Sequence, residues 1–173
     1  RTFVYNKAPF PAFVGGFGSG KTAAAIARIM TLKRLCPKQD VAYYLPTYGL
    51  VEDIAYQRFP ELLEKNGFSY KLNHQAATLT LDLGRIIFRT MDNPDKIIGY
   101  EVAHSVCDEL DTLPIDKARN VWNKVIARNR QKAFTHAGTP IPNSVAVATT
   151  SEGFRFVYER WVKTKVAGYE LVR

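Results

Sequence analysis

The stretch that decides the fold is residues 15–22, which read GGFGSGKT. It fits the pattern G-x-x-x-x-G-K-[ST]. Four glycines in its first six positions let the backbone wrap with its N–H groups facing inward, because no side chain blocks their approach to phosphate oxygens. Lys21 can then reach the β- and γ-phosphates of a nucleotide, and the Thr22 hydroxyl can ligate Mg²⁺. The pattern therefore predicts a nucleotide site, with ATP and Mg²⁺ as the expected ligands.

The sequence on either side of this loop agrees with that interpretation. Residues 10–14 (FPAFV) form a short apolar run typical of a buried strand entering the loop, and residues 22–35 are predicted to form the helix that leaves it. The amino end of that helix adds the positive end of its dipole to the phosphate site. The residues expected to contact the nucleotide are Gly16, Phe17, Gly18, Ser19, Gly20, Lys21 and Thr22.

The composition is that of an ordinary globular protein with an excess of positive charge. The chain has 173 residues, of which 46% are hydrophobic and 23% charged, enough to bury a core in one domain. Its net charge of +8 favours polyanionic partners. We expect neither a membrane span, which needs ~20 apolar residues, nor a signal peptide. Because the sequence begins at Arg1 rather than Met, we expect it to be a piece of a longer protein.

Cysteine and histidine residues show no pattern of metal ligands. Cys36 and Cys107 are isolated in the sequence, and Cys107 lies in an apolar run, so a buried free thiol in a reducing compartment is expected there. The three histidines, none of which has ligand spacing, are expected to be non-catalytic. They are His74, His104 and His136.

The remaining periodicity predicts an α/β fold with a mainly parallel sheet. Residues 41–45 (VAYYL) and 145–149 (VAVAT) are continuous apolar runs, typical of central parallel strands. Shorter strands with an antiparallel arrangement are expected to extend one edge of the sheet. Those edge strands are residues 68–73, 78–81 and 85–89, and a last strand is expected at 169–172. The further expected helices are residues 50–59, 60–65 (starting at Pro60), 115–132 and 152–162.

A pair of acids follows another apolar run. Residues 105–109 read SVCDE, so a strand would deliver Asp108 and Glu109 to the carboxyl edge of the sheet, where ligand sites of α/β proteins lie. Asp108 would there hold Mg²⁺, directly or through a water molecule. Glu109 would orient and deprotonate the attacking water. Such a pair is a weak signal alone, but it gains weight in a chain that already contains the phosphate loop.

The predicted helix 115–132 is rich in positive charge. Lys117, Lys124 and Arg128 lie on one flank of its apolar stripe, whereas Arg119 and Arg130 lie on the other. Two interpretations stay open. The cations either solvate the surface, with lysine stems covering the core, or face the phosphates of a nucleic acid. Under the second interpretation, Lys117, Lys124 and Arg128 are the candidate DNA contacts.

Two further segments bear on the nucleotide. Hydroxyl groups at Thr149, Thr150 and Ser151 end a predicted strand and could sense the γ-phosphate or couple it to movement, although Ser151 could also simply cap the next helix. Near the start of the chain, Phe3 and Tyr5 could stack on adenine. An amino-terminal arm that packs on the core is an equally good interpretation of these aromatic residues.

Taken in order, these motifs resemble a known family. The sequence runs through GGFGSGKT (15–22), YYLPTYG (43–49), NPDKIIGYEVAHSVCDELD (93–111), KARNVWNKVIARNRQ (117–131) and VAVATTSEG (145–153). This series resembles the ATPase domain of the large terminase subunit, the DNA-packaging motor of tailed bacteriophages. The resemblance covers most of the chain.

The resemblance carries its own expectations. It implies a P-loop NTPase fold of the additional-strand, RecA-like type, a three-layer sandwich in which the Asp108 strand is not the sequence neighbour of the P-loop strand. It implies that Thr149–Ser151 corresponds to the coupling motif, with Thr150 acting beside the catalytic Lys21 and Glu109. It further implies ATP hydrolysis that drives double-stranded DNA into a procapsid. The same resemblance implies a homo-oligomer in the host cytoplasm that is not bound to a membrane. Its expected partners are the portal protein and the small terminase subunit.

Departures from the family pattern concern arginines and a second domain. Many relatives carry Arg where this chain has Phe17 in the loop, and Arg where it has Ile98 before Gly99, so the arginine finger stays unassigned. Large terminases also carry a carboxyl-terminal nuclease domain, whereas the acids after Asp116 are too few and too dispersed for a two-metal cluster. Residues 1–173 are therefore expected to form a single ATPase domain without the nuclease.

Two other functions use parts of the same pattern. A helicase-like ATPase acting on single strands contains the same series of P-loop, Asp-Glu and Ser/Thr motifs. A nucleotide-binding interaction module without turnover is the other alternative. The Glu109 carboxylate argues against that module, because binding alone does not need it.

Overall fold

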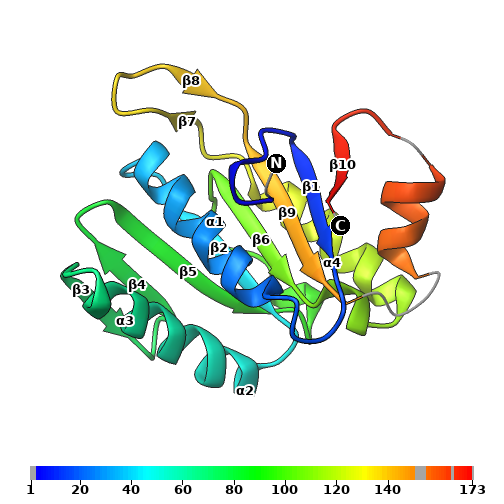
Figure 1. Cartoon of the computed structure of the whole chain (residues 1–173), viewed down its shortest axis with the longest axis horizontal. Coiled ribbons are helices and arrows are strands. Elements are labelled where there is room, and N and C mark those ends of the chain that lie inside the picture. Colours follow the sequence, from blue (N-terminus) through cyan, green and yellow to red (C-terminus); the bar gives the residue numbers. More distant parts are fainter. Residues whose placement is uncertain (1–2, 151–154, 165, 173) are drawn as a thin grey trace.

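The computed structural model describes residues 3–150, 155–164 and 166–172 and is built on one large sheet (Figure 1). The strands of this sheet are β1 (Phe10–Val14), β2 (Val41–Leu45), β3 (Tyr70–Asn73), β4 (Thr78–Leu81), β5 (Gly84–Thr90), β6 (His104–Asp108), β9 (Ser144–Thr149) and β10 (Tyr169–Val172). Their spatial order is β10-β1-β9-β6-β2-β5-β4-β3. All pairs from β10 to β5 are parallel, and the β5–β4 and β4–β3 pairs are antiparallel. The predicted sheet is confirmed, with one correction: β5 pairs in parallel with β2.

Strand β9 separates β1, which enters the glycine-rich loop, from the acidic strand β6. Val14 lies opposite Thr149 in one ladder, and Asp108 lies opposite Ala148 in the next. Because these strands are parallel, their carboxyl ends meet at one edge of the sheet. This is the additional-strand order expected from the resemblance. It brings three distant parts of the chain to the same place.

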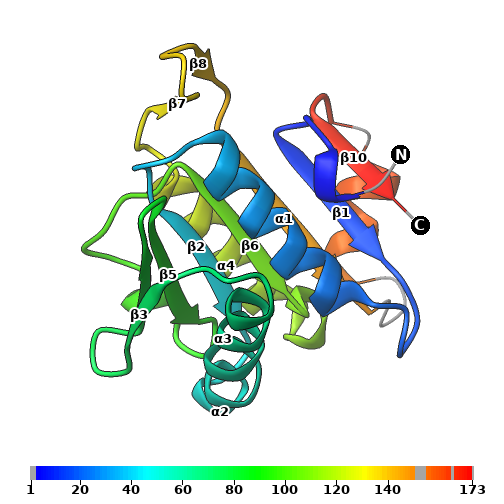
Figure 2. The same ribbon diagram turned by 60° about the vertical axis from the view of Figure 1, so that its left-hand side comes forward.

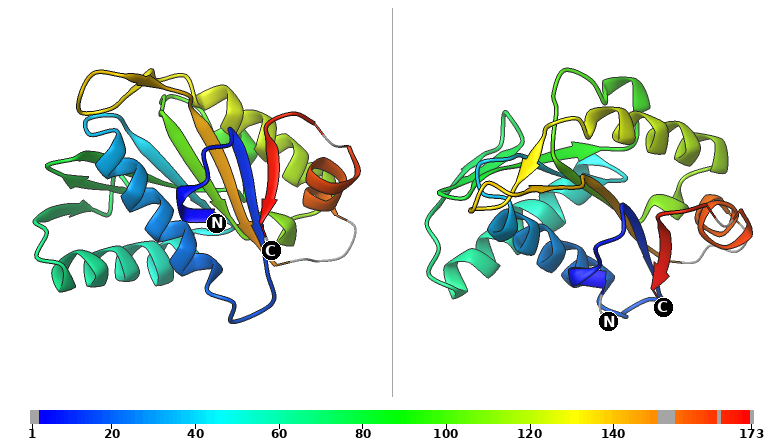
Figure 3. Two further views of the ribbon diagram at one scale, coloured as in Figure 1. Left: turned by 45° about the horizontal axis from the view of Figure 1, so that its top comes forward. Right: turned by 90° about the horizontal axis from the view of Figure 1, so that it is seen from above.

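Helices cover both faces of the sheet, which gives three layers (Figures 1 and 3). One face carries α1 (Lys21–Leu35) and the helical run formed by α2 (Tyr48–Leu50), the π-helix η2 (Val51–Ala55) and α3 (Tyr56–Lys65). The other face carries α4 (Ile115–Arg128) and the π-helix η5 (Tyr158–Lys163). Short 3-10 turns are η1 (Phe3–Tyr5), η3 (Pro94–Lys96) and η4 (Leu110–Thr112). Each face has its own buried apolar core.

Neighbouring residues of β2 enter opposite cores. Tyr43 packs in the core beneath α1 and α3, whereas Tyr44 packs in the core beneath α4. Both side chains are completely buried. Successive side chains of a strand point to opposite faces, so a strand covered on both sides must be apolar at every position. This explains the continuous apolar runs of β2 and β9, in which every residue is buried.

The helical run after β2 differs from the prediction at Pro60. Residues 48–65 are helical throughout, and Pro60 lies inside α3 instead of starting a second helix. Proline removes one backbone hydrogen bond from a helix and usually breaks it. Here Phe59 and Leu63 are completely buried beside it, and their packing outweighs the lost bond. The predicted break at Pro60 is therefore wrong.

Helix α4 ends at Arg128 and not at residue 132 as predicted. Asn129 explains the early end, because its side-chain amide donates hydrogen bonds to Ala103 O at 3.1 Å and Ser144 O at 2.9 Å. These bonds compete with continuation of the helix and tie its end to β6 and β9.

A small hairpin between α4 and β9 was not predicted. It consists of β7 (Ala133–Phe134) and β8 (Pro140–Ile141), which pair with each other and not with the central sheet. The hairpin extends beyond the amino end of β9 (Figures 1 and 2). Two residues per strand are too few for an alternating pattern to be recognised in the sequence.

The amino-terminal arm packs on the core through Phe3. This side chain is buried, and its ring lies 5.8 Å from the Phe13 ring. The Arg28 guanidinium of α1 lies 5.4 Å from the Phe3 ring and donates a hydrogen bond to the Phe3 carbonyl at 2.8 Å. For Phe3 the packing interpretation holds, whereas Tyr5 is exposed.

Three smaller expectations can be compared with the structure. Both cysteines are free and buried, as expected for Cys107. None of the helices in the described ranges is long and apolar enough to cross a membrane. The predicted helix 152–162 begins outside the described residues, and its described part overlaps η5 (Tyr158–Lys163). Ser151, the predicted cap of this helix, also lies outside the described residues.

Candidate active site

The loop between β1 and α1 depends on its glycines. Gly18 and Gly20 have φ angles of 73° and 80°, in the left-handed region that side chains disfavour. A Cβ on Gly15 would lie 2.5 Å from Ser19 Oγ, so a side chain at residue 15 would force Ser19 to move. The Gly15 N–H donates to Thr149 O at 3.2 Å. The loop is thereby held at the carboxyl end of β9, with the amino end of α1 behind it.

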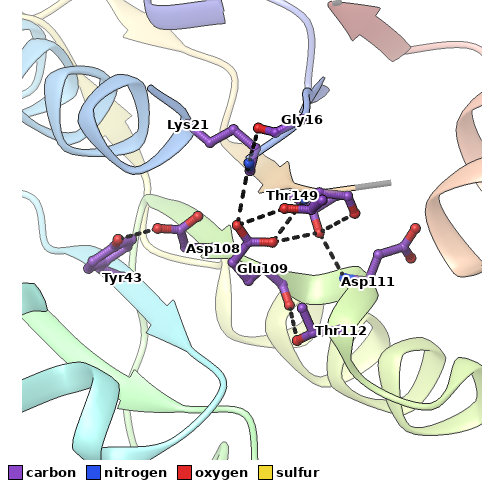
Figure 4. A network of polar contacts seen from close by, with 9 residues as sticks. Gly16, Lys21, Tyr43, Asp108, Glu109, Asp111, Thr112 and Thr149 are labelled. Carbon is purple, nitrogen blue, oxygen red and sulfur yellow. Dashed lines mark hydrogen bonds and ion pairs between the residues drawn. The ribbon is translucent and has the colours of Figure 1, made fainter. Parts of the chain in front are cut away.

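Lys21, the first residue of α1, is buried between the loop and the acidic strand. Its Nζ donates to Gly16 O at 2.8 Å and lies 3.6 Å from Glu109 Oε1 (Figure 4). Both partners are oxygen atoms, as phosphate oxygens would be. The ammonium group can therefore donate to a phosphate in their place.

Glu109 combines an unusual backbone with a well-held carboxylate. Its φ of 54° and ψ of 41° lie in the left-handed region, which is uncommon for a residue with a side chain. The carboxylate accepts hydrogen bonds from the Thr150 N–H at 2.8 Å, Thr150 Oγ1 at 3.1 Å and Thr149 Oγ1 at 3.5 Å. The Glu109 N–H donates to Ala148 O at 2.7 Å. Strained residues fixed by their surroundings in this way are concentrated at functional sites.

Asp108 is completely buried at the end of β6, and its two carboxylate oxygens differ. The Tyr43 hydroxyl donates to Oδ2 at 2.6 Å, whereas Oδ1 has no hydrogen-bond partner. Burial raises the pKa of Asp108 to about 6, although the hydrogen bond from Tyr43 and the neighbouring Thr22 hydroxyl act in the opposite direction. Burial and the Asp108 carboxylate raise the pKa of Tyr43 well above its usual range. The phenol therefore stays neutral and donates.

These residues fit a Mg²⁺ ion bound together with a nucleotide. Asp108 Oδ1 is a buried acceptor that lacks a partner, and Thr22 lies close enough to the carboxyl group to lower its pKa. Mg²⁺ at phosphoryl-transfer sites is usually held by one or two protein oxygens together with phosphates and waters. In the described parts of the chain, no three His, Cys, Asp or Glu side chains gather to hold a metal without such help.

The structure brings most of the predicted site residues together at one edge of the sheet (Figure 4). Those that meet there are Lys21, Thr22, Asp108, Glu109 and Thr150, with the loop residues Gly16–Gly20 beside them. Two contacts were not predicted, one from Tyr43 to Asp108 and one from Thr149 to Glu109. Tyr43 looks like a core residue in the sequence, and only the pairing of β2 with β6 reveals its position. The functional roles of all these residues stay predictions.

The candidate DNA residues lie elsewhere, on α4 across the sheet from α1. Lys124 Nζ is 3.5 Å from Asp95 Oδ1. The further ion pairs on this side are Arg119 with Asp116 at 2.9 Å, Arg119 with Glu159 at 2.9 Å, and Arg130 with Glu101 at 2.7 Å. Asp116 of α4 itself and acids from neighbouring segments thus balance part of the positive charge that the sequence assigns to this helix. The DNA contact stays a prediction.

Phe17 and Ile98, which stand where relatives often have Arg, are both exposed, at 90% and 60%. The Phe17 ring lies 6.0 Å from Lys21 Nζ. Neither side chain can place a positive charge on a phosphate. The arginine finger therefore stays unassigned.

The strand order, the glycine-rich loop and the acids at the end of β6 together define the fold of a P-loop NTPase. The profile of one family, described as "Terminase large subunit, T4likevirus-type, N-terminal", matches residues 12–166. The chain therefore belongs to this family of large terminase subunits. No curated protein matches the sequence significantly.

Solved structures of large terminases share the fold. The large terminase from a thermophilic bacteriophage gives a TM-score of 0.69 at 15% identity, over 98% of this chain and 40% of that one. The complex of the same protein with ADP gives a TM-score of 0.68 at 16% identity, over 95% of this chain and 40% of that one. The ATPase domain of the Thermus phage P74-26 large terminase gives 0.62 at 17% identity, over 91% and 65%. This chain thus spans 40% of the length of the large terminase from the thermophilic bacteriophage.

Proposed function

We propose that this chain binds Mg·ATP and hydrolyses it, and that hydrolysis powers the translocation of double-stranded viral DNA into a procapsid. The observation that carries the proposal is the placement of Glu109, 3.6 Å from the P-loop lysine on one side and bonded to Thr150 on the other. Binding alone does not require a carboxylate at this point. The ADP and ATP-γ-S complexes of the large terminase from the thermophilic bacteriophage support an adenine nucleotide as the ligand.

Each residue has a separate task under this proposal. The backbone N–H groups of the loop bind the β-phosphate, and Lys21 donates to phosphate oxygens in place of Gly16 O. Glu109, oriented by Thr150, positions a water molecule and accepts its proton. Thr22 and Asp108 would hold Mg²⁺, which would neutralise charge on the phosphate oxygens when bound.

Thr150 also offers a route from the nucleotide to the rest of the domain. It follows β9 directly, and both its N–H and its hydroxyl donate to the Glu109 carboxylate. A displacement of Glu109 by substrate or product would therefore also shift Thr150 at the end of β9. This contact supports the coupling role that the resemblance assigns to the Thr149–Ser151 segment.

Glu109→Gln tests the catalytic assignment. The amide keeps the size of the side chain but cannot accept the proton, so hydrolysis should fall by roughly 10²–10⁴-fold while ATP binding is retained. The matched control is Glu101→Gln, the same change at an exposed residue that pairs with Arg130. Calorimetry would measure binding, and phosphate release would measure turnover. Normal hydrolysis by Glu109→Gln would refute the role of Glu109 as the base.

The proposal extends to partners in the assembled motor. Because Phe17 and Ile98 provide no arginine, a residue from a neighbouring copy would complete the charge around the γ-phosphate, an effect worth roughly 10³–10⁵ in rate. The isolated chain should then hydrolyse ATP slowly and be stimulated on assembly at the portal, with the small terminase subunit as a further partner in the host cytoplasm. Membership of the large terminase family favours duplex packaging over single-strand helicase activity.

A further inference from the structure

The contact between Tyr43 and Asp108 is a part of the site that the sequence did not indicate. Tyr43 comes from β2, the neighbour of β6 in the sheet, where it lies opposite Val106. Its ring extends along the strands to reach the carboxylate two residues further on, at 2.6 Å from Oδ2. Figure 4 shows the phenol pointing at Asp108 from the side away from Lys21.

The packing around the Tyr43 ring restricts its orientation. The ring is completely buried and packs edge-on against Phe59 of α3, with a centroid distance of 5.8 Å and an interplanar angle of 65°. Phe59 in turn packs on Phe88 of β5 at 5.3 Å. A rigid ring held on this aromatic stack keeps its hydroxyl at a fixed point, and Asp108 supplies the hydrogen-bond acceptor there.

This bond distinguishes the two oxygens of the carboxylate. Oδ2 is occupied by a hydrogen bond from a neutral phenol, and rotation of the carboxyl group is therefore restricted. Oδ1 is buried and has no partner, so it is the oxygen available to a ligand. A metal ligand is usually oriented by an outer hydrogen bond of this kind, and losing that bond typically costs 10–100-fold in metal affinity.

We propose that Tyr43 is a positioning residue for the metal, which fixes Asp108 so that Oδ1 faces the Mg²⁺ of the bound nucleotide. This inference rests on the proposed function, since it assumes a metal–nucleotide complex beside Thr22. Under this proposal Tyr43 acts through its hydrogen bond to Asp108 and not by direct contact with the nucleotide or the metal. Its effect should therefore appear in metal affinity and not in the chemical step.

The neighbouring tyrosine provides a matched control. Tyr44 is equally buried on the same strand, but it faces the opposite core, and its hydroxyl lies 3.0 Å from the Tyr100 hydroxyl. Tyr43→Phe and Tyr44→Phe thus each remove one hydroxyl group and the hydrogen bond that it makes. Tyr44→Phe should lower stability by about 1 kcal/mol, and Tyr43→Phe by about 1.5–3 kcal/mol because its acceptor is a carboxylate. Only Tyr43→Phe should change the metal site.

The test is a titration of Mn²⁺, a spectroscopic substitute for Mg²⁺, into each protein saturated with ADP, with free Mn²⁺ measured by electron paramagnetic resonance. Tyr43→Phe should weaken Mn²⁺ binding by roughly 10–100-fold, whereas Tyr44→Phe should match the wild type. ADP affinity in the presence of EDTA should be equal in all three. The Mg²⁺ concentration for half-maximal hydrolysis should rise in Tyr43→Phe, while the rate at saturating Mg²⁺ stays near that of the wild type.

A double-mutant cycle separates positioning from a general structural effect. In an Asp108→Ala background, Tyr43→Phe should have no further effect on Mn²⁺ affinity, because the carboxylate that it orients is gone. Equal Mn²⁺ affinity in the wild type, Tyr43→Phe and Tyr44→Phe would overturn this inference alone. Failure of the wild type to bind ADP or Mn²⁺ would overturn the proposed function and this inference with it.

Discussion

The two ends of the central sheet both bury charged residues, but they use them differently. At the amino end, Arg28 donates to Phe3 O at 2.8 Å, to Asn6 O at 3.0 Å and to Ser144 Oγ at 3.3 Å. Its partners are groups of the fold itself, which tie α1 to the amino-terminal arm and to β9. At the carboxyl end, Asp108 is buried just as deeply and accepts a hydrogen bond from Tyr43. Each residue keeps one buried atom without a partner, Arg28 Nε and Asp108 Oδ1.

This comparison indicates that burial of a charged residue is by itself a poor marker of function. Arg28 and Asp108 both have pKa values shifted by burial, to about 10 and about 6. What separates the two ends is the surroundings of the buried charge. Arg28 is bonded by groups of the fold, whereas Asp108 lies beside the glycine-rich loop with Lys21 and Glu109 close by. At the carboxyl end the left-handed Glu109 also places its carboxylate 3.6 Å from Lys21, and strained residues of this kind are concentrated at functional sites.

The largest effects should come from removing the buried cation at each end of the sheet, Lys21 or Arg28. Lys21→Ala should weaken ATP binding on the order of 100-fold or more, because the phosphates lose the buried ammonium group that pairs with them. The free energy of unfolding should change little. Arg28→Met should do the opposite. It removes the donor to the Asn6 carbonyl and the Ser144 hydroxyl and one of two donors to Phe3 O, which keeps the Asn6 N–H at 3.3 Å. The free energy of unfolding should therefore fall by about 2–4 kcal/mol, with ATP affinity of the folded protein unchanged.

Urea unfolding and calorimetry measure the two quantities independently. Arg34→Met, an exposed arginine of the same helix, is the control for Arg28→Met and should change stability by less than about 0.5 kcal/mol. If Arg28→Met lost ATP binding while remaining folded, the division between a structural end and a ligand-binding end would be wrong.

A smaller effect is expected from pH, through His104 at the amino end. Its Nδ1 accepts a hydrogen bond from the Ser144 N–H at 3.1 Å, and its Nε2 lies 3.5 Å from Cys36 Sγ. Burial, with Arg28 and Lys33 nearby, lowers the pKa of His104 to about 4. Between pH 6.5 and 4 the unfolded chain therefore binds a proton that the native state does not. The contribution of His104 to stability is complete above about pH 6.5 and decreases by about 3 kcal/mol as the pH falls to 4.

The measurement compares wild type with His104→Gln. Asp108 titrates in the same window with the opposite sign: its pKa is raised on folding, so its contribution improves as the pH falls. Since Asp108 is present in both proteins, the difference between their free energies of unfolding isolates His104. That difference should shrink between pH 7.5 and pH 4.5, and a constant difference would contradict the assignment.

The sequence predicts most of the carboxyl end of the sheet and little of the amino end. The glycine pattern locates Lys21 by itself, whereas the two acids after an apolar run point to Glu109 only because the chain already contains that loop. His104 and Arg28 meet their partners only through tertiary packing, which no local pattern records. The contact of Tyr43 with Asp108 was not predicted for the same reason. In the sequence, a tyrosine that donates to a buried carboxylate looks the same as one that only packs in a core. Pro60 shows the converse, since a strong local signal for a helix break is overridden by the burial of its neighbours.

The smallest effects concern α4, whose charges belong to neither end of the sheet. If Lys117, Lys124 and Arg128 contact DNA phosphates, changing all three to Ala should weaken duplex binding at every sequence. It should also reduce the slope of log affinity against log salt by about one unit per contact. Replacing the exposed Lys7, Lys65 and Lys71 removes the same charge from other surfaces and is the control. An equal loss of slope in both triple variants would mean that net charge, and not α4, attracts the duplex.

The ion pair between Lys124 and Asp95 sharpens this last test. Both side chains are exposed, so the pair is worth only about 0.2–1 kcal/mol, but it competes with any phosphate for the ammonium group. Asp95→Asn should therefore strengthen duplex binding by up to about fivefold at low salt, and only when Lys124 is present. Fluorescence anisotropy with a labelled duplex at several salt concentrations measures both affinity and slope. If Asp95→Asn strengthens binding equally in a Lys124→Ala background, Lys124 does not lie on the DNA path.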